Sequence, residues 1–125
     1  MKLEGTGLIA RIYIGESDSW EGRPLYEAIV HRLRQRGIAG ATVLRGIEGY
    51  GKRSVLHTTR ILRLSEDLPI VVEVVDREDR LRAVLPELDA MVTDGMITLE
   101  PVEVIVYRAV GIDRVPLDPS GDEPA

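Results

Sequence analysis

Cysteine is absent from the 125 residues of this chain, so neither disulfide bonds nor thiolate metal sites can form. Aromatic residues are scarce, with one Trp, four Tyr and no Phe, which argues against a stacking surface for single-stranded nucleic acid. The formal net charge is -5 at pH 7, so no overall positive field would collect DNA or RNA. We therefore expect no nucleic-acid partner.

Long apolar runs are missing as well. No stretch of about 18 apolar residues is present, which excludes a membrane-spanning helix. The first residues, MKLEGTG, lack the apolar segment of a signal peptide. Together these features predict a cytoplasmic protein.

Apolar and β-branched residues recur in segments that alternate with helical patterns. A first helix is expected to start at Pro24 and stop before Gly37, because proline suits the first turn and glycine ends helices. Strands are expected at Leu8–Ile14, Ala41–Ile47, Pro69–Asp76 and, as one strand or a pair, in the segment 96–108.

A second helix is predicted from an apolar stripe at helical spacing, made of Leu81, Val84, Leu85, Leu88, Met91 and Val92. Asp76 is expected to cap its N-terminus. Pro86 falls inside the stripe, so we expect a kink there or a helix that begins later than Asp76 suggests.

The order βαββαβ predicts an α+β, ferredoxin-like fold with a four-stranded antiparallel sheet and two helices on one face. Residues 1–108 would form this domain. The segment 109–125 is acidic and rich in proline, and we expect it to be a mobile tail.

The sheet face without helices shows two apolar residues around one charge in each of three strands. The charged residues are Arg11, Glu73 and Glu103. Such a face is too apolar for water, which favours a subunit interface with a buried ion cluster over a catalytic carboxylate pair. The alternative is that long loops or the tail cover it.

The stretch GIEGYGKRS, Gly46 to Ser54, resembles a phosphate-binding loop without matching it. Gly46, Gly51 and Lys52 fit, but Arg53 stands where Ser or Thr would hold Mg²⁺. A flexible backbone beside two cations can still bind an anion, although such glycines often form only a turn.

Candidate catalytic and metal residues are few. The two histidines, His31 and His57, lack companion ligands, so we expect no metal site. No nucleophile–base pair or carboxylate dyad stands at a recognisable spacing, so we expect no enzymatic activity and no catalytic residues.

Several motifs together resemble one family. The segments RGIEGYGKR, HTTRILRLSEDLPIVVEVVD and VTDGMITLEPVEVIVYR are similar to the PII-like signalling proteins, in particular to their uncharacterised branch, the domain of unknown function 190 family. The resemblance covers roughly residues 5–108. It implies a homotrimer whose sheets face a common centre, with adenine nucleotides or related effectors in the clefts between subunits.

The resemblance also implies ligand contacts. The expected ligand-binding residues are Gly49, Gly51, Lys52, Arg53, Asp94, Gly95 and Arg108. Met96 and Val106 stand where these proteins carry further phosphate-binding cations. AMP, ADP or cyclic AMP is therefore expected as the effector rather than ATP, and no resident cofactor is required.

The predicted function is that of a regulator, which binds its effector and signals to a partner through a mobile loop, residues 52–66. The partner could be a membrane transporter or another regulated protein. Two alternatives stay open: a structural or adaptor trimer without ligand, and a weak nucleotide-hydrolysing enzyme.

Overall fold

The computed structural model describes residues 4–51, 57–58 and 67–108. Its elements follow the predicted order, with four short strands added. They are β1 (Gly5–Gly15), β2 (Ser19–Trp20), β3 (Arg23–Pro24), α1 (Leu25–Gln35), β4 (Ala41–Arg45), β5 (Glu48–Gly49), β6 (His57–Thr58), β7 (Pro69–Asp76), α2 (Glu78–Met91) and β8 (Met96–Val104).

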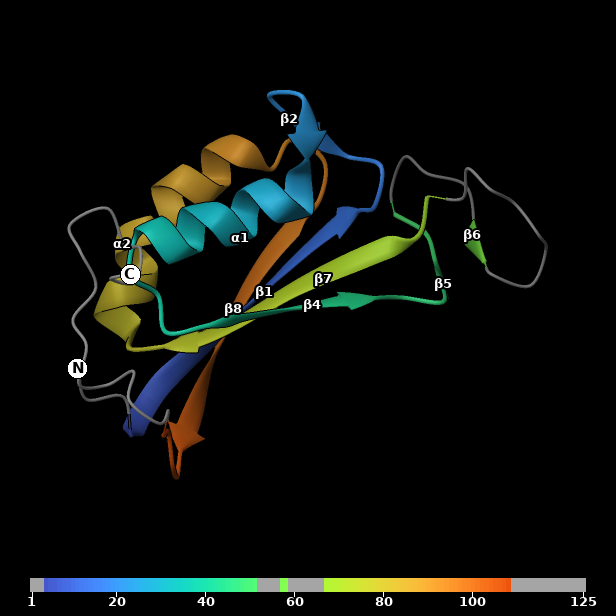
Figure 1. Ribbon diagram of the computed structural model, residues 1–125. Coiled ribbons are helices and arrows are strands. Elements are labelled where there is room, and N and C mark those ends of the chain that lie inside the picture. The colour runs from blue at the N-terminus through green and yellow to red at the C-terminus, as the bar shows by residue number, and fades with distance from the viewer. Residues whose placement is uncertain (1–3, 52–56, 59–66, 109–125) are drawn as a thin grey trace.

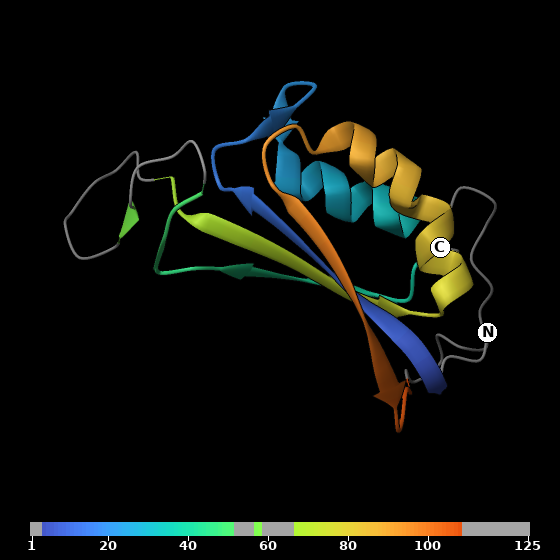
Figure 2. The same cartoon turned by 180° about the vertical axis from the view of Figure 1, so that it is seen from behind.

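The main sheet has the strand order β4-β7-β1-β8, and all of its neighbouring strands are antiparallel. Both helices lie against one face of this sheet, and no helix covers the opposite face in either view (Figures 1 and 2). The predicted ferredoxin-like fold is confirmed.

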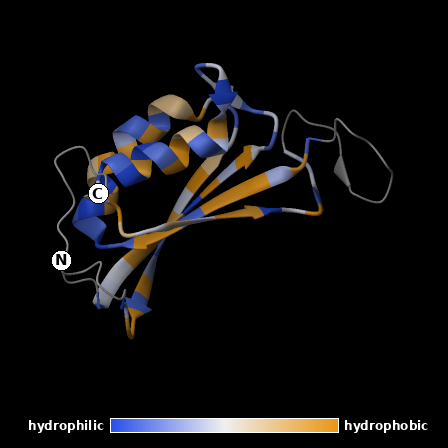
Figure 3. Ribbon diagram, viewed as in Figure 1, coloured by the Kyte–Doolittle hydropathy of each residue, from blue (hydrophilic) through white to orange (hydrophobic). Residues whose placement is uncertain are grey.

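Alternation along the central strands builds the core. In β1 and β7 every second residue is buried under the helices, among them Ala10, Ile12, Val72 and Val74. These side chains share one buried core cluster with residues of α1 and α2, among them Ile29 and Leu81. Figure 3 shows the long apolar stretches of the strands and the mixed polar and apolar surfaces of the helices.

The ends of α1 lie close to their predicted positions. Pro24 occupies the N-cap position, one residue before the helix begins. Gly37 has a φ of +76°, a left-handed conformation that favours glycine, and it follows the C-cap residue Arg36.

The start of α2 differs from the prediction. Arg77, not Asp76, is the N-cap residue, and no side chain caps the helix. Asp76 is fully buried, and its carboxylate is used in contacts with the loop after α1. The helix begins at Glu78, one residue later than an N-cap at Asp76 would place it. Pro86 lies inside this helix.

The segment between β1 and α1, expected to be a polar loop, contains a short hairpin. Its strands β2 and β3 are joined by Glu21 and Gly22, whose φ values of +50° and +82° fit a tight two-residue hairpin turn. Trp20 packs against the core from this hairpin. No alternating pattern marks these strands in the sequence, because each is only two residues long.

Strand β8 is a single strand that starts beside the end of β1. A Cβ atom on Gly95 would lie 2.3 Å from the carbonyl oxygen of Tyr13, so only glycine allows this approach of the two backbones. The predicted turn at Asp94–Gly95 therefore has a packing reason of its own.

We predict that Gly95→Ala lowers the free energy of unfolding by about 1–3 kcal/mol, because the new methyl group would force β8 away from β1. Gly40→Ala is the matched control, since a Cβ there meets no atom within 4 Å. Urea denaturation followed by circular dichroism measures both variants. Equal stability of Gly95→Ala and Gly40→Ala would contradict the close approach.

The two helices are joined on their outer side by an ion cluster. Arg36 binds both carboxylate oxygens of Glu87 at 2.7 Å, and Arg32 contacts the same carboxylate at 3.0 Å. The hydrogen bonds from Arg36 are the main reason that the pKa of Glu87 is lowered, against a smaller opposing effect of desolvation.

The lowered pKa predicts a pH dependence of stability. The contribution of Glu87 is complete above the pKa of an unfolded-state glutamate, about 4.3, and is lost as the pH falls through the lower pKa of the folded state. Glu87→Gln should therefore be less stable than wild type at pH 7, and the difference should shrink toward pH 3. Denaturant melts across this range measure it, with Asp89→Asn on the same helix as control. A difference that stays constant with pH would contradict the assignment.

Candidate ligand-binding groove

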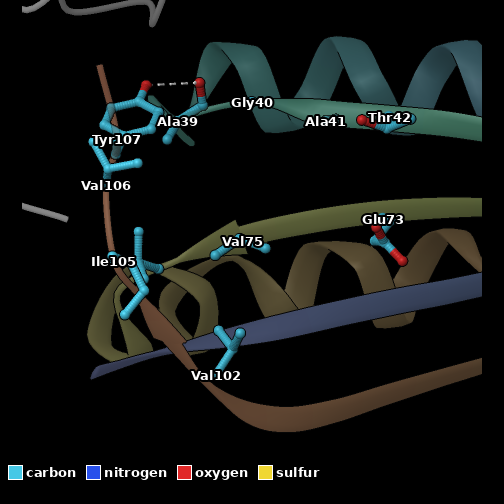
Figure 4. Close-up of a pocket in the computed structure, with 11 residues that line it drawn as sticks. Ala39, Gly40, Ala41, Thr42, Glu73, Val75, Val102, Ile105, Val106 and Tyr107 are labelled. Carbon is cyan, nitrogen blue, oxygen red and sulfur yellow. Dashed lines mark hydrogen bonds between the residues drawn. The ribbon is translucent and has the colours of Figure 1, made fainter. Parts of the chain in front are cut away.

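An open groove of about 600 Å³ lies on the sheet face that has no helices, toward the end of the sheet where β4 begins and β7 and β8 end. Figure 4 shows its side chains converging from these strands and from the segment after β8. Its lining consists of Ala39, Gly40, Ala41, Thr42, Glu73, Val75, Val102, Val104, Ile105, Val106 and Tyr107.

The walls of the groove are mainly aliphatic. Valines from β7 and β8 line one side, and polar groups come from Thr42, Glu73 and Tyr107. Ligand sites in proteins commonly have this composition, with apolar walls and a few polar groups that fix orientation, in volumes of about 300–1,000 Å³.

Residues 39 and 40 form one wall of the groove, and the buried Asp76 fixes this wall by a hydrogen bond to Ala39. The carboxylate of Asp76 accepts hydrogen bonds from the backbone N–H groups of Ala39, at 2.9 Å, and Arg77, at 2.7 Å. Arg80 contacts the same carboxylate at 3.3 Å and also donates to the carbonyl oxygen of Gly37. Because Asp76 is fully buried, these bonds compensate its charge and fix the loop after α1.

The end of the groove is closed by residues Ile105–Tyr107, which we call the strap. The strap continues the chain past the end of β8 at Val104 and crosses toward Ala39 (Figure 4). The Tyr107 hydroxyl donates to the carbonyl oxygen of Ala39 at 3.4 Å, and the backbone N–H of Tyr107 donates to Glu4 at 3.0 Å.

An ion cluster occupies the same open face beside the groove. Arg11 Nε lies 3.0 Å from Glu73 Oε2, and a second nitrogen of the same guanidinium contacts Glu100. The hydrogen bond to Glu100, followed by that to Glu73, raises the pKa of Arg11. The side chains of Arg11 and Glu73 are each 33% exposed, so within one chain the cluster is only partly shielded from water.

The predicted third member of this cluster was placed on the wrong face. Glu103 pairs with Thr6 in the register of β1 and β8, whereas Val102 and Val104 line the groove. Neighbouring residues of a strand point to opposite faces, so Glu103 points away from Arg11 and Glu73. Glu100 takes its place, as the diagonal cross-strand neighbour of Arg11.

The glycine-rich stretch lies at the other end of the sheet. A Cβ atom on Gly46 would lie 2.7 Å from Cγ of Pro69 and one on Gly49 would lie 3.0 Å from it, so both glycines have a packing reason. Gly49 belongs to β5, and Gly51 is exposed. Lys52 and Arg53 lie outside the described residues.

The remaining predicted ligand residues are divided between the two ends. Asp94 and Gly95 precede β8, beside the end of β1, whereas the exposed Arg108 follows the strap. The ends of β8, Met96 and Val104, are eight residues apart, or about 27 Å at about 3.4 Å per residue. One chain therefore does not bring Gly49, Asp94 and Gly95 together with Arg108.

Sequence reasoning missed the groove itself. Thr42, Glu73, Val75 and Tyr107 come from three separate parts of the chain, and only the register of β4 with β7 and of β8 with β1 brings them to one end. The sequence predicts the strand that contains Glu73 and Val75 and places Thr42 shortly after the helix end at Gly37. It does not show that these residues meet at one end of the sheet.

Within residues 4–51, 57–58 and 67–108, no group of three or more His, Cys, Asp or Glu residues could hold a metal ion. In the same part of the chain, no helix is both long and apolar enough to cross a membrane.

Comparison with known proteins adds relatives and structural neighbours. The family model DUF190, described as Uncharacterized ACR, matches residues 7–104. A UPF0166 protein of Aquifex aeolicus is 41% identical over 97 residues, covering 78% of this chain and 91% of the relative. A UPF0166 protein of Methanocaldococcus jannaschii is also 41% identical, over 77% of this chain and 89% of its own length.

Two solved structures share the fold at low identity. Both are of CPII from Thiomonas intermedia K12, one bound to ADP and bicarbonate and the other to ADP, AMP and bicarbonate. Their TM-scores are 0.54 and 0.56 at 16% identity, with 79% of this chain and 88% of each CPII chain covered. The second is described as a nitrogen regulatory PII-like protein. With its family match and its relatives, the chain belongs to the DUF190 family, and it shares its fold with the PII-like protein CPII.

Proposed function

We propose that this protein is a PII-like regulator that binds an adenine nucleotide in clefts between subunits. The observation that carries the proposal is the groove, whose apolar walls suit the faces of a purine ring and whose strap leads directly to Arg108. The ADP and AMP bound by CPII, which shares the fold, support the choice of nucleotide.

The two-ended arrangement of the predicted ligand residues favours a site made by two chains. Gly49, Gly51, Asp94 and Gly95 belong to one end of the sheet and Arg108 to the other, so a second copy is needed to join them. The open face supports such an assembly, because it carries the groove, the valines of β8 and the Arg11 cluster without a covering helix. We propose a homotrimer built through this face.

In this arrangement the glycine-rich turn would let the backbone of one subunit approach the phosphate, with Lys52 and Arg53 supplying charge. Arg108 of a neighbouring subunit can add a planar, bidentate contact. The exposed Met96 and Val106 are apolar where cations would meet the outer phosphates. AMP, ADP and cyclic AMP should therefore bind about as well as ATP. Signalling to a protein partner through residues 52–66, which lie mainly outside the described residues, belongs to the same proposal.

The assembly is tested by light scattering. Wild type should have about three times the chain mass of 13.9 kDa. Glu73→Lys should dissociate it, because the new cation would face Arg11 on the interface. Glu78→Lys is the control with the same charge change, on the outer side of α2 where Glu78 pairs with Arg82. A wild-type monomer, or a Glu73→Lys protein as trimeric as the control, would contradict the assembly.

Nucleotide binding is tested by calorimetric titration of AMP, ADP, ATP and cyclic AMP. Arg108→Ala, Lys52→Ala and Arg53→Ala should each weaken binding by about ten- to a hundredfold, since a hydrogen bond between charged groups contributes about 1.5–3 kcal/mol. Arg82→Ala, on the surface of α2, is the control.

Two results of this titration would count against the proposal. No binding of any of the four nucleotides at millimolar concentration would leave a structural or adaptor protein as the better description. A preference for ATP by orders of magnitude would show that the site binds the outer phosphates strongly despite the apolar residues Met96 and Val106. Phosphate release during incubation with ATP would instead favour the enzymatic alternative.

A further inference from the structure

We propose that Tyr107 is a positioning residue of the nucleotide site: its hydroxyl fastens the strap to the loop after α1 and so fixes where Arg108 meets the ligand. The inference rests on the proposed function, in which Arg108 contacts the phosphate. It adds Tyr107 as a residue that acts on the ligand through Arg108. No motif of the sequence marks this role.

The strap is fastened at Tyr107 from two directions. The hydroxyl reaches Ala39 of the loop after α1, and the backbone N–H reaches Glu4 before β1 (Figure 4 shows the hydroxyl contact). Tyr107 is partly buried, while Ile105 is 77% exposed and Val106 is 50% exposed. Tyr107 is therefore the point at which this short segment is held against the body of the protein.

The residue that accepts this hydrogen bond, Ala39, is itself held by a hydrogen bond to a buried group. The peptide N–H of Ala39 is bound by the buried carboxylate of Asp76, which Arg80 also contacts. The carbonyl oxygen that Tyr107 reaches belongs to this same residue, Ala39. A chain of contacts thus runs from the start of α2 through the loop after α1 to the strap.

The effect on a ligand follows from chain connectivity. Consecutive Cα atoms are about 3.8 Å apart, so Arg108 can start only within that distance of the anchored Tyr107. Val106, on the other side of Tyr107, lines the groove. Release of the hydroxyl would free both the end wall of the groove and the base of the Arg108 side chain. Binding would then have to order them again, which costs conformational entropy.

A double-mutant cycle tests the inference, with ADP as the probe in calorimetric titration. Tyr107→Phe keeps the ring and removes only the hydroxyl, and it should weaken ADP binding by about three- to tenfold. In the Arg108→Ala background the same change should have little further effect, because a positioning residue acts through the group it positions. Tyr26→Phe, on α1, is the matched control and should bind ADP like wild type.

A second measurement needs no ligand. The ¹H–¹⁵N heteronuclear NOE of the Arg108 amide should fall in Tyr107→Phe and stay unchanged in Tyr26→Phe, with equal melting temperatures for both variants. If wild type binds no nucleotide but this NOE falls, the proposed function fails while the anchoring of Arg108 by Tyr107 stands.

Three results would overturn the positioning role. The first is an Arg108 amide that stays as ordered in Tyr107→Phe as in wild type. The second is unchanged ADP affinity of Tyr107→Phe in a wild type that binds ADP. The third is a loss of affinity as large in the Arg108→Ala background as in wild type, which would mean that the hydroxyl contacts the ligand itself.

Discussion

The sheet of this protein is largely apolar on both faces, and the two helices of the described residues both cover the same face. Burial of alternate residues of β1 and β7 under α1 and α2 builds the core and stabilises the domain. The same strands present Ile9, Tyr13, Val71 and Val75 to the other side, where they are only partly buried. The groove, the ion cluster and the proposed subunit contact all lie on this second face.

One buried carboxylate, that of Asp76, fixes the loop after α1, which forms a wall of the groove on the open face. Asp76 comes from the last position of β7, and its bonds reach forward to Arg77 and Arg80 and back to Ala39. An uncompensated charge at this depth would be strongly destabilising, so the loop after α1 must hold its position for the bonds to form. The groove wall is thus a by-product of satisfying one buried charge.

The sequence was informative where the pattern was long and regular. The bounds of β7 and the left-handed Gly37 at the end of α1 were both readable, because burial alternates with period two in strands and glycine ends helices. The hairpin at Ser19–Pro24 could not be predicted in this way, because strands of two residues leave no periodic signal.

Errors in the site came from register and from competing uses of one residue. Glu103 was assigned to the open face from the pattern of the last strand, but the pairing of β8 with β1 shifts that face to Val102 and Glu100. Asp76 fitted a helix cap by position, yet its carboxylate binds Ala39 across the fold as well as the nearby Arg77 and Arg80. The glycines at 46, 49 and 95 have packing reasons in the described structure, so glycine alone could not identify a ligand contact.

The distance between the two ends of the sheet has a thermodynamic consequence for the proposed site. A site whose halves come from different copies exists only in the assembled protein, so ligand occupancy and self-association become linked equilibria. Ligand would then draw subunits together, and dilution of the protein alone would lower the apparent affinity for ligand. The cellular abundance of such a protein would act as an input to the regulator, alongside the concentration of its ligand.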